Sequence, residues 1–161
     1  MCGNKTTFTS DAGFRISYPR PWRSESPTRR SSPVKVYIYP TTASAIDAVD
    51  VAASDLDRDM TLDAFTNSNL EELASFRDYT LLSSEDIYAA GHPARKITWQ
   101  ATVPVLLETI EGESRVAQLK AVQIFVIRGT TGYVISYKAS PKDFDKYLTQ
   151  AQEVIDSFAF T

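Results

Sequence analysis

The sequence has one cysteine and one histidine among 161 residues, and this scarcity excludes several kinds of site. A structural zinc site takes four Cys or His ligands, so Cys2 and His92 cannot form one. A lone cysteine cannot form an internal disulfide, and His92 is the only histidine that could serve a Ser-His-Asp or Cys-His catalytic group. Neither a glycine-rich phosphate loop nor a G-x-S-x-G motif occurs. We therefore predict a non-enzymatic protein with no catalytic residue, no cofactor and no metal.

Long hydrophobic runs are also missing. The longest is Val103–Leu107, whereas a membrane-spanning helix needs roughly 20 apolar residues. No basic and apolar leader precedes the domain, so we expect that an export signal was removed or never existed. Eight Tyr and eight Phe supply the aromatic surface that a disordered chain lacks. The composition predicts one soluble globular domain.

The charges are distributed unevenly along the chain. Residues 1–40 carry seven basic and two acidic side chains, residues 41–90 carry two basic and eleven acidic ones, and the remainder is nearly balanced. A basic and an acidic region of this kind can orient a charged partner, although solvated loop and sheet faces produce the same pattern.

Alternating apolar residues predict the strands. Phe14, Ile16 and Tyr18 alternate before Pro19 and Pro21, which cannot donate hydrogen bonds to a strand ladder. Further strands are predicted at 34–39, within 47–53, and at 79–88, 95–100, 120–127 and 133–137. The short turn at 90–93 requires antiparallel neighbours, and the Ser- and Pro-rich segment 23–33 is predicted to be an exposed, mobile loop.

Two helices are expected from apolar residues at helical spacing. The first begins at Asp59 or Thr61 and has five apolar residues near one face: Leu62, Phe65, Leu70, Leu73 and Phe76. The second begins with Ser140 as N-cap and Pro141 in the first turn, and Asp143 is placed to reach back to the cap. The sequence therefore predicts an α+β domain, with a central antiparallel sheet of about six strands flanked by helices.

Three acidic patterns and one histidine do not form convincing sites. Asp55, Asp57 and Asp59 resemble the start of a calcium loop, but its required glycine and final glutamate are absent. His92 lies between Gly91 and Pro93, which predicts a water-exposed turn. The neighbouring carboxylates of the pairs Glu71-Glu72 and Glu85-Asp86 should point apart, which is unsuitable for acid–base catalysis.

A basic, aromatic-flanked stretch is the best candidate for a partner contact. It contains Arg15, Arg20, Trp22, Arg23, Arg29, Arg30 and Lys35. The isoelectric point near 5.2 and the absence of an RNA-recognition motif argue against nucleic acid. We predict that Arg20, Arg23, Arg29 and Arg30 contact an acidic protein surface.

Four segments, in this order, carry a family resemblance. They are GFRISYPRPW at 13–22, GHPA at 91–94, QIFVIRG at 123–129 with GYVISY at 132–137, and IDSFAF at 155–160. Together they resemble the PsbP family and its generic bacterial branch, whose fold is shared with a Ran-binding nuclear-transport factor. The resemblance implies a PsbP-like α/β/α sandwich over residues 8–161. Residues 44–76 depart from the photosynthetic members, and the helix opening at 61–65 is more similar to the generic bacterial ones.

Cys2 gains significance beside this resemblance, because relatives of the family are extrinsic or lipid-anchored. Met1-Cys2-Gly3-Asn4 followed by polar residues resembles a bacterial lipoprotein after removal of its signal peptide. Residues 1–7 would then be a flexible tether. We expect an exported protein with lipidation at Cys2, placed in the periplasm, at the cell surface or in the thylakoid lumen; an unmodified Cys2 would indicate a cytoplasmic protein.

The sequence thus predicts an accessory protein that binds an unidentified protein partner and touches the membrane only through its anchor. Three alternatives stay open: a photosystem II assembly or oxygen-evolving-complex extrinsic subunit, a cytosolic adaptor for a small GTPase, and an enzyme with an unrecognised cleft. Besides the basic stretch, the acidic segments 55–63 and 108–113 are expected contact surfaces.

Overall fold

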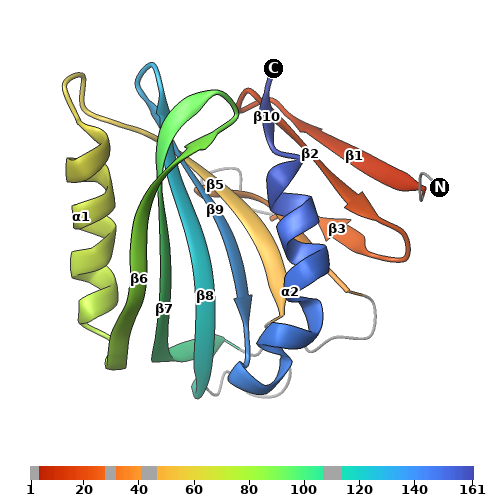
Figure 1. The fold of residues 1–161 in the computed structure, drawn as a ribbon, viewed down its shortest axis with the longest axis vertical. Helices are drawn as coiled ribbons and strands as arrows, with labels where there is room; N and C mark the ends of the chain where they lie inside the picture. Colours follow the sequence, from red (N-terminus) through yellow and green to blue (C-terminus); the bar gives the residue numbers. More distant parts are fainter. Residues whose placement is uncertain (1–3, 28–31, 41–46, 107–113) are drawn as a thin grey trace.

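The computed structural model describes residues 4–27, 32–40, 47–106 and 114–161. Within these ranges the chain forms ten strands and two helices (Figure 1). They follow in the order β1 (Lys5–Ser10), β2 (Phe14–Pro19), β3 (Arg23–Glu25), β4 (Val34–Tyr39), β5 (Ala48–Asp55), α1 (Leu62–Ala74), β6 (Arg77–Ala89), β7 (His92–Leu106), β8 (Ser114–Arg128), β9 (Thr131–Ala139), α2 (Pro141–Asp156) and β10 (Ala159–Phe160).

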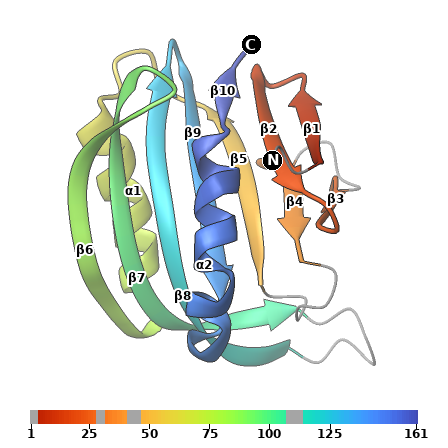
Figure 2. The same ribbon diagram turned by 45° about the vertical axis from the view of Figure 1, so that its right-hand side comes forward.

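The strands form two antiparallel sheets. The large sheet has seven strands in the order β3-β4-β5-β9-β8-β7-β6, and the small one has three in the order β1-β2-β10. Figure 2 shows β6 as the border of the large sheet, with β4 and β3 toward the opposite border. The helical connection between β5 and β6 lets these two strands lie far apart in the same sheet.

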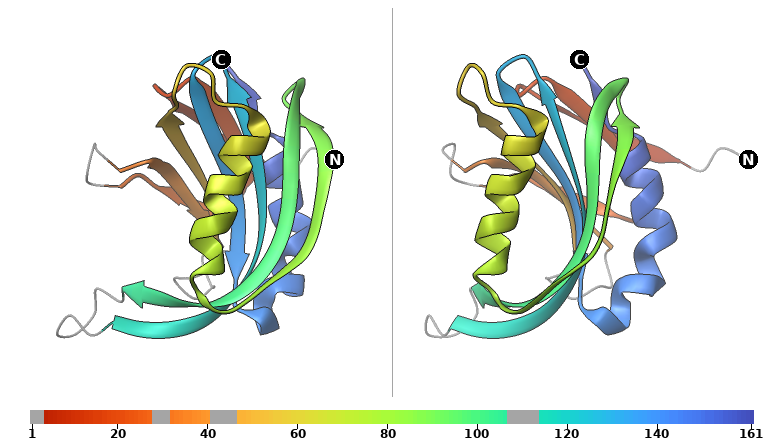
Figure 3. Two further views of the ribbon diagram at one scale, coloured as in Figure 1. Left: turned by 90° about the vertical axis from the view of Figure 1, so that its left-hand side faces the viewer. Right: turned by 60° about the vertical axis from the view of Figure 1, so that its left-hand side comes forward.

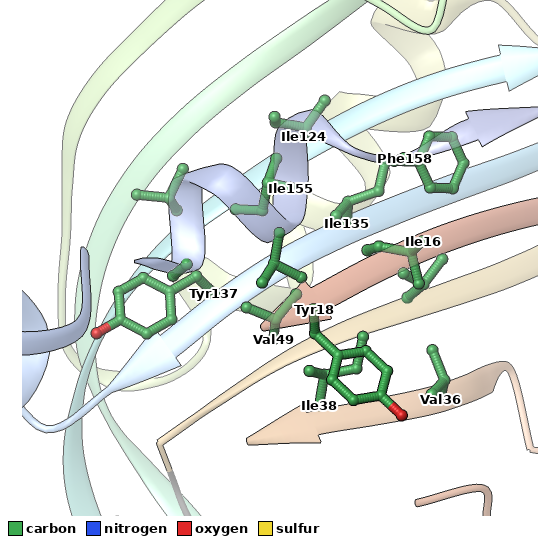
Figure 4. Packing of buried hydrophobic residues seen from close by; sticks show 14 of the residues in the cluster. Ile16, Tyr18, Val36, Ile38, Val49, Ile124, Ile135, Tyr137, Ile155 and Phe158 are labelled. Atoms are coloured by element: carbon green, nitrogen blue, oxygen red, sulfur yellow. The ribbon is translucent and has the colours of Figure 1, made fainter. Parts of the chain in front are cut away.

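The two helices lie on opposite faces of the large sheet, as the right-hand view of Figure 3 shows. On one face, α2 and the small sheet bury a cluster that includes Phe14, Ile16, Tyr137 and Ile155, part of which is drawn in Figure 4. On the other face, α1 inserts Phe65 against strands β7 and β8. This is the α/β/α sandwich expected for a PsbP-like chain, and the α+β prediction is confirmed.

The core under α1 contains a line of hydrogen bonds across three strands. Trp99 Nε1 donates to Gln123 Oε1 at 2.8 Å, and Gln123 Nε2 donates to Ser136 Oγ at 3.0 Å. All three residues are buried. Their polar atoms therefore have hydrogen-bond partners inside an apolar layer, and these bonds fix the positions of β7, β8 and β9 relative to one another beneath α1.

Both helices start at the residues that the sequence predicts, and one hydrogen bond at the start of α2 differs from a capping box. Thr61 Oγ1 accepts a hydrogen bond from the backbone N–H of Ala64, so Thr61 is the N-cap of α1. Ser140 caps α2, but its backbone N–H donates to Asp47 Oδ1 rather than to Asp143. The Asp143 carboxylate instead accepts from the Ser140 hydroxyl. Asp143 therefore reaches back to the cap as predicted, but it bonds the Ser140 hydroxyl, because the buried carboxylate of Asp47 accepts from the Ser140 backbone N–H.

Three short strands were not predicted from the sequence. Strand β3 occupies the start of the predicted loop 23–33 because its residues pair with β4, and β10 pairs with β2. Strand β1 begins at Lys5, which pairs with Pro19. The tether predicted for residues 1–7 is therefore wrong for residues 5–7; residues 1–3 lie outside the described ranges.

Candidate functional site

An open hollow lies between α2 and the β6 side of the large sheet. Helix α2 packs mainly against β9 and β2, away from the β6 border. The β6 side of this face is consequently left as an open groove of about 570 Å³. We call this hollow the α2 groove. Its lining residues are Glu85, Lys96, Thr98, Lys120, Val122, Phe144, Leu148, Thr149, Gln152, Glu153 and Asp156.

Strand alternation explains the floor of the α2 groove. Ile97 and Trp99 point into the core beneath α1, so their neighbours Lys96 and Thr98 point to the opposite face. Lys120 lies on β8 with the same orientation, and its ammonium group is 4.6 Å from the centre of the Phe144 ring. The floor therefore combines cationic and hydroxyl groups with an apolar helix face.

Acidic side chains form the rim of the α2 groove. Glu85 of β6 pairs with Lys96 in the strand register, and Glu153 and Asp156 line the α2 side. Asp86, the neighbour of Glu85, points to the other face of the sheet and forms an ion pair of 2.7 Å with Arg95. The carboxylates of Glu85 and Asp86 thus point apart, as their adjacency in a strand predicted, and the border of the sheet is acidic on both faces.

A smaller hollow of about 180 Å³ continues the groove toward β10 and shares Lys96, Gln152 and Asp156 with it. We call it the apolar pocket, because much of its lining is hydrophobic. These residues come from β6, β8, β9 and the C-terminal end of α2 with the residues after it: Ile87, Tyr88, Ala89, Ile124, Ile135, Ile155 and Phe158. Tyr88 stands at its border with 78% of its surface exposed. Tyrosine is enriched at protein interfaces, because its ring is apolar and its hydroxyl group is polar.

Buried carboxyl groups lie away from the groove. Asp47 is fully buried beneath the start of α2, and its Oδ2 has no hydrogen-bond partner among the described residues. Burial raises the pKa of Asp47, the Ser140 N–H opposes this, and nearby Asp143 adds to it. The same environment raises the pKa of Tyr137, first through burial and then through the charge of Asp47. Tyr137 donates its hydroxyl hydrogen to the Phe144 carbonyl at 2.7 Å, so these groups hold the first turn of α2 in place.

Asp50 is a second buried carboxylate, on the face opposite α2. Its nearest cation is Lys138, at 3.7 Å. Burial raises the pKa of Asp50 more than Lys138 lowers it. Burial and the nearby Asp50 carboxylate also raise the pKa of Tyr37. This pair joins β5 to β9 and has a structural role.

Only some of the sequence-predicted contact residues can be placed. Cys2, Arg29 and Arg30 lie outside the described ranges, and so does the acidic segment 108–113. Arg20 is exposed directly after β2, and Arg23 is exposed as the first residue of β3. Trp22, between them, is buried and meets Tyr147 edge to face at 6.4 Å. Trp22 is therefore an anchor for α2, whereas Arg20 and Arg23 are accessible to a partner.

His92 is less exposed than the sequence predicted. It is the first residue of β7, and its ring stands edge-on to Phe160 at 5.0 Å. Its Nδ1 lies 3.1 Å from the Ala90 carbonyl. The correction follows from β10, which was not predicted and which brings the C-terminal aromatic residue beside the turn. These contacts give His92 a packing role.

The acidic patterns are spread over separate elements. Asp55 ends β5, Asp57 and Asp59 are exposed in the connection to α1, and Asp63 forms an ion pair with Arg95 at 2.7 Å. Within the described ranges, no three Cys, His, Asp or Glu residues come close enough to share a metal ion. Neither described helix is long and apolar enough to cross a membrane.

The α2 groove itself was missed by sequence reasoning. The alternation of Lys96 and Thr98 with Ile97 and Trp99 is a readable signal that polar side chains share one face. What no pattern reveals is the lateral position of α2, because this depends on packing against β2, which is distant in the chain. A solvated face and the floor of a groove therefore look the same in the sequence.

Comparisons with known proteins define the fold. No family model matches the chain, and no curated protein matches its sequence. Among solved structures, cyanobacterial PsbP from Synechocystis superposes with a TM-score of 0.69 at 13% identity, covering 100% of this chain and 95% of that one. LpqN of Mycobacterium tuberculosis, involved in cell envelope biogenesis, gives 0.61 at 14% identity, covering 98% and 91%.

A third solved structure is a Pseudomonas aeruginosa protein of unknown function described as a putative regulator. It gives a TM-score of 0.58 at 14% identity and covers 96% of each chain. Identities this low show the fold alone. The chain has a PsbP-like fold, as the four sequence segments indicated.

Proposed function

We propose that this protein is a non-enzymatic accessory protein that acts by binding another protein. The observation that carries the proposal is the α2 groove: it is wide and open, and it has an apolar helix wall with lysines on the floor and acids on the rim. Surfaces of mixed character with a few exposed aromatic groups suit protein recognition. The one histidine of the chain is packed against Phe160, which leaves no general base of that type for the groove.

The proposal includes export and lipidation at Cys2. The sequence Cys2-Gly3-Asn4 supports it, as does the similar fold of LpqN, a protein of cell envelope biogenesis. Arg20 and Arg23 form a second proposed protein contact, with Arg29 and Arg30 included on the sequence argument.

A photosystem II accessory role is the second candidate. The observation in its favour is the full-length superposition on Synechocystis PsbP. A photosynthetic source and co-purification with photosystem II would support it over the general proposal.

Site-specific photo-crosslinking in the native host tests the proposed function. A photoreactive amino acid at Thr98, on the groove floor, should capture a discrete protein partner, and the same group at exposed Glu71 on α1 serves as the matched control. Equal labelling from both positions, or none from Thr98, would contradict the binding role. Mass spectrometry of the mature protein tests the anchor, since an unmodified Cys2 in the native host removes that part of the proposal.

A further inference from the structure

Strand β6 is the long open border of the large sheet. The seven-stranded sheet ends at β6, and no described strand pairs with its outer side (Figure 2). The opposite border strand, β3, has three residues, whereas β6 has thirteen. An unpaired border of this length offers backbone N–H and C=O groups to an added strand.

The two halves of β6 differ in regularity. Register shifts interrupt its pairing with β7 between Arg77 and Thr80 and again between Leu81 and Ser83, and Asp78 has a positive φ of 57°. Bulges of this kind twist a strand edge away from further pairing. From Ser83 to Ala89 the register runs without interruption. The segment Ser83–Ala89, which we call the open edge, is therefore the part of β6 able to accept another strand.

The side chains of the open edge define what an added strand would meet. Glu85 and Asp86 stand next to each other at its centre and point to opposite faces. Asp86 keeps 83% of its side chain exposed despite its bond to Arg95, and Glu85 is on the rim of the α2 groove. Neighbouring basic residues on a partner strand would face these two carboxylates, one on each side of the sheet.

The apolar end of the open edge completes the recognition pattern. Ile87 and Tyr88 follow the carboxylates, and both line the apolar pocket of about 180 Å³. An apolar side chain opposite Ile87 points to the α2 face and can reach the pocket, and one opposite Tyr88 can cover its exposed ring. The pattern on the partner is thus two apolar residues beside two basic residues.

We propose that the open edge binds an extended segment of the partner protein as an additional antiparallel strand, recognised through a basic pair next to an apolar pair. The inference rests on the proposed binding function and names the chemistry of the partner. Antiparallel pairing is expected because it is slightly more stable per residue and is the pairing of every strand in the sheet. Backbone hydrogen bonds would supply affinity, and the side chains would supply specificity.

The probe is a short peptide, Thr-Val-Val-Arg-Arg-Thr-Thr, which places its valines opposite Tyr88 and Ile87 and its arginines opposite Asp86 and Glu85. Its addition to the isotope-labelled protein should shift the backbone amide NMR signals of residues 83–89 and slow their hydrogen exchange. A peptide with both arginines replaced by glutamate should cause no such change. A peptide with proline in place of the second valine should also fail, because proline removes an N–H and disfavours the extended pairing.

Charge reversal gives an independent measurement. Glu85→Lys should weaken binding of the peptide about tenfold, because an attraction is replaced by a repulsion. Glu25→Lys, on exposed β3 at the other border, makes the same change in net charge and should leave the affinity unchanged. If the amide signals of residues 83–89 do not respond to the peptide, the inference is overturned whether or not Glu85→Lys folds. Equal weakening by both reversals would show attraction to net charge alone and would overturn it too.

The crosslinking and NMR experiments distinguish a failure of strand addition from a failure of the proposed binding function. A partner crosslinked through Thr98 together with an unresponsive open edge would leave the binding role intact and remove strand addition. A responsive open edge without any crosslinked partner would leave the peptide site intact and remove the accessory role in that host.

Discussion

Trp99 and Gln123 are joined by a buried hydrogen bond of 2.8 Å that belongs to the sheet rather than to any site. The same Gln123 side chain donates onward to Ser136, so one amide satisfies two partners on neighbouring strands. Burial makes this link more costly to remove than an equivalent bond at the surface.

Replacing Gln123 with leucine should therefore destabilise the protein by about 2 kcal/mol, because Trp99 Nε1 and Ser136 Oγ both lose their partner. Chemical denaturation with far-UV circular dichroism measures the loss. Trp99→Phe removes the indole N–H that Gln123→Leu leaves without an acceptor. Trp99→Phe should therefore lower the free energy of unfolding less in the Gln123→Leu protein than in the parent protein. Simple additivity of the two changes would contradict the account.

Gly132 is required for the close approach of β9 to side chains beneath α1. It is the second residue of β9, and a Cβ placed there would lie 2.7 Å from Phe65 Cζ and 2.9 Å from Leu56 Cδ1. Gly132→Ala should cost about 1–3 kcal/mol in the free energy of unfolding, through crowding beneath α1. Phe65→Leu should recover part of this loss in the double variant, as measured by thermal unfolding.

Gly129 provides the comparison, since it has a φ of +63° and its Cβ position is open. Gly129→Ala should cost about 1 kcal/mol through backbone strain alone, and Phe65→Leu should not relieve it. If Phe65→Leu recovered stability in both the Gly132→Ala and the Gly129→Ala proteins, its effect would be general and would not come from the contact with position 132.

Asp47 should make stability depend on pH. Because its pKa is raised in the folded state, the folded protein favours the protonated form, and that stabilisation is lost as pH rises through the folded pKa. Asp47→Asn removes the cost of ionisation while keeping an oxygen for the Ser140 N–H. The melting temperature of the variant minus that of the parent should therefore increase between about pH 4 and about pH 7.

Differential scanning calorimetry across this range checks the Asp47 prediction. Asp145→Asn, an exposed change on α2, should give a flat difference. A difference for Asp47→Asn that falls with pH would mean that the ionised carboxylate stabilises the folded state.

Arg95 ties α1 to the border strand through Asp63 and Asp86, each at 2.7 Å. Arg95→Met keeps most of the aliphatic stem and should destabilise by about 1 kcal/mol at low salt, with a smaller effect near 1 M salt because exposed charges are screened. Arg77→Met, whose guanidinium is 4.0 Å from Asp78 on an exposed surface, should have little effect at either salt concentration. Thermal unfolding at both concentrations distinguishes the two variants.

Much of the fold was predictable because its main elements carry their own periodicity. The alternation at Phe14, Ile16 and Tyr18 identified β2, and the apolar stripe of α2 identified the docking helix. The short strands lacked this signal. Strand β3 contains Arg23, Ser24 and Glu25, and its strand conformation comes from pairing with β4 rather than from residue preference.

The candidate site was less predictable for a related reason. Lys96 and Glu85 are neighbours through strand register, and Phe144 reaches Lys120 of β8 from α2, which follows β9 in the chain. Side chains that converge through tertiary packing leave no local spacing to read. The basic residues singled out from the sequence form a cluster along the chain, and that kind of cluster can be seen without a structure.

The pairing of Lys5 with Pro19 limits how far the domain could stand from a membrane. The backbone N–H of Arg20 also donates to the Asn4 carbonyl at 3.1 Å, so the chain is held at the β2 end from residue 4 onward. If Cys2 carries the proposed lipid, the chain from Cys2 to Lys5 spans at most about 10 Å. The domain would then lie next to the bilayer, with Arg20 and the end of β2 facing the lipid headgroups. It could bind only partners that lie equally close to the membrane surface.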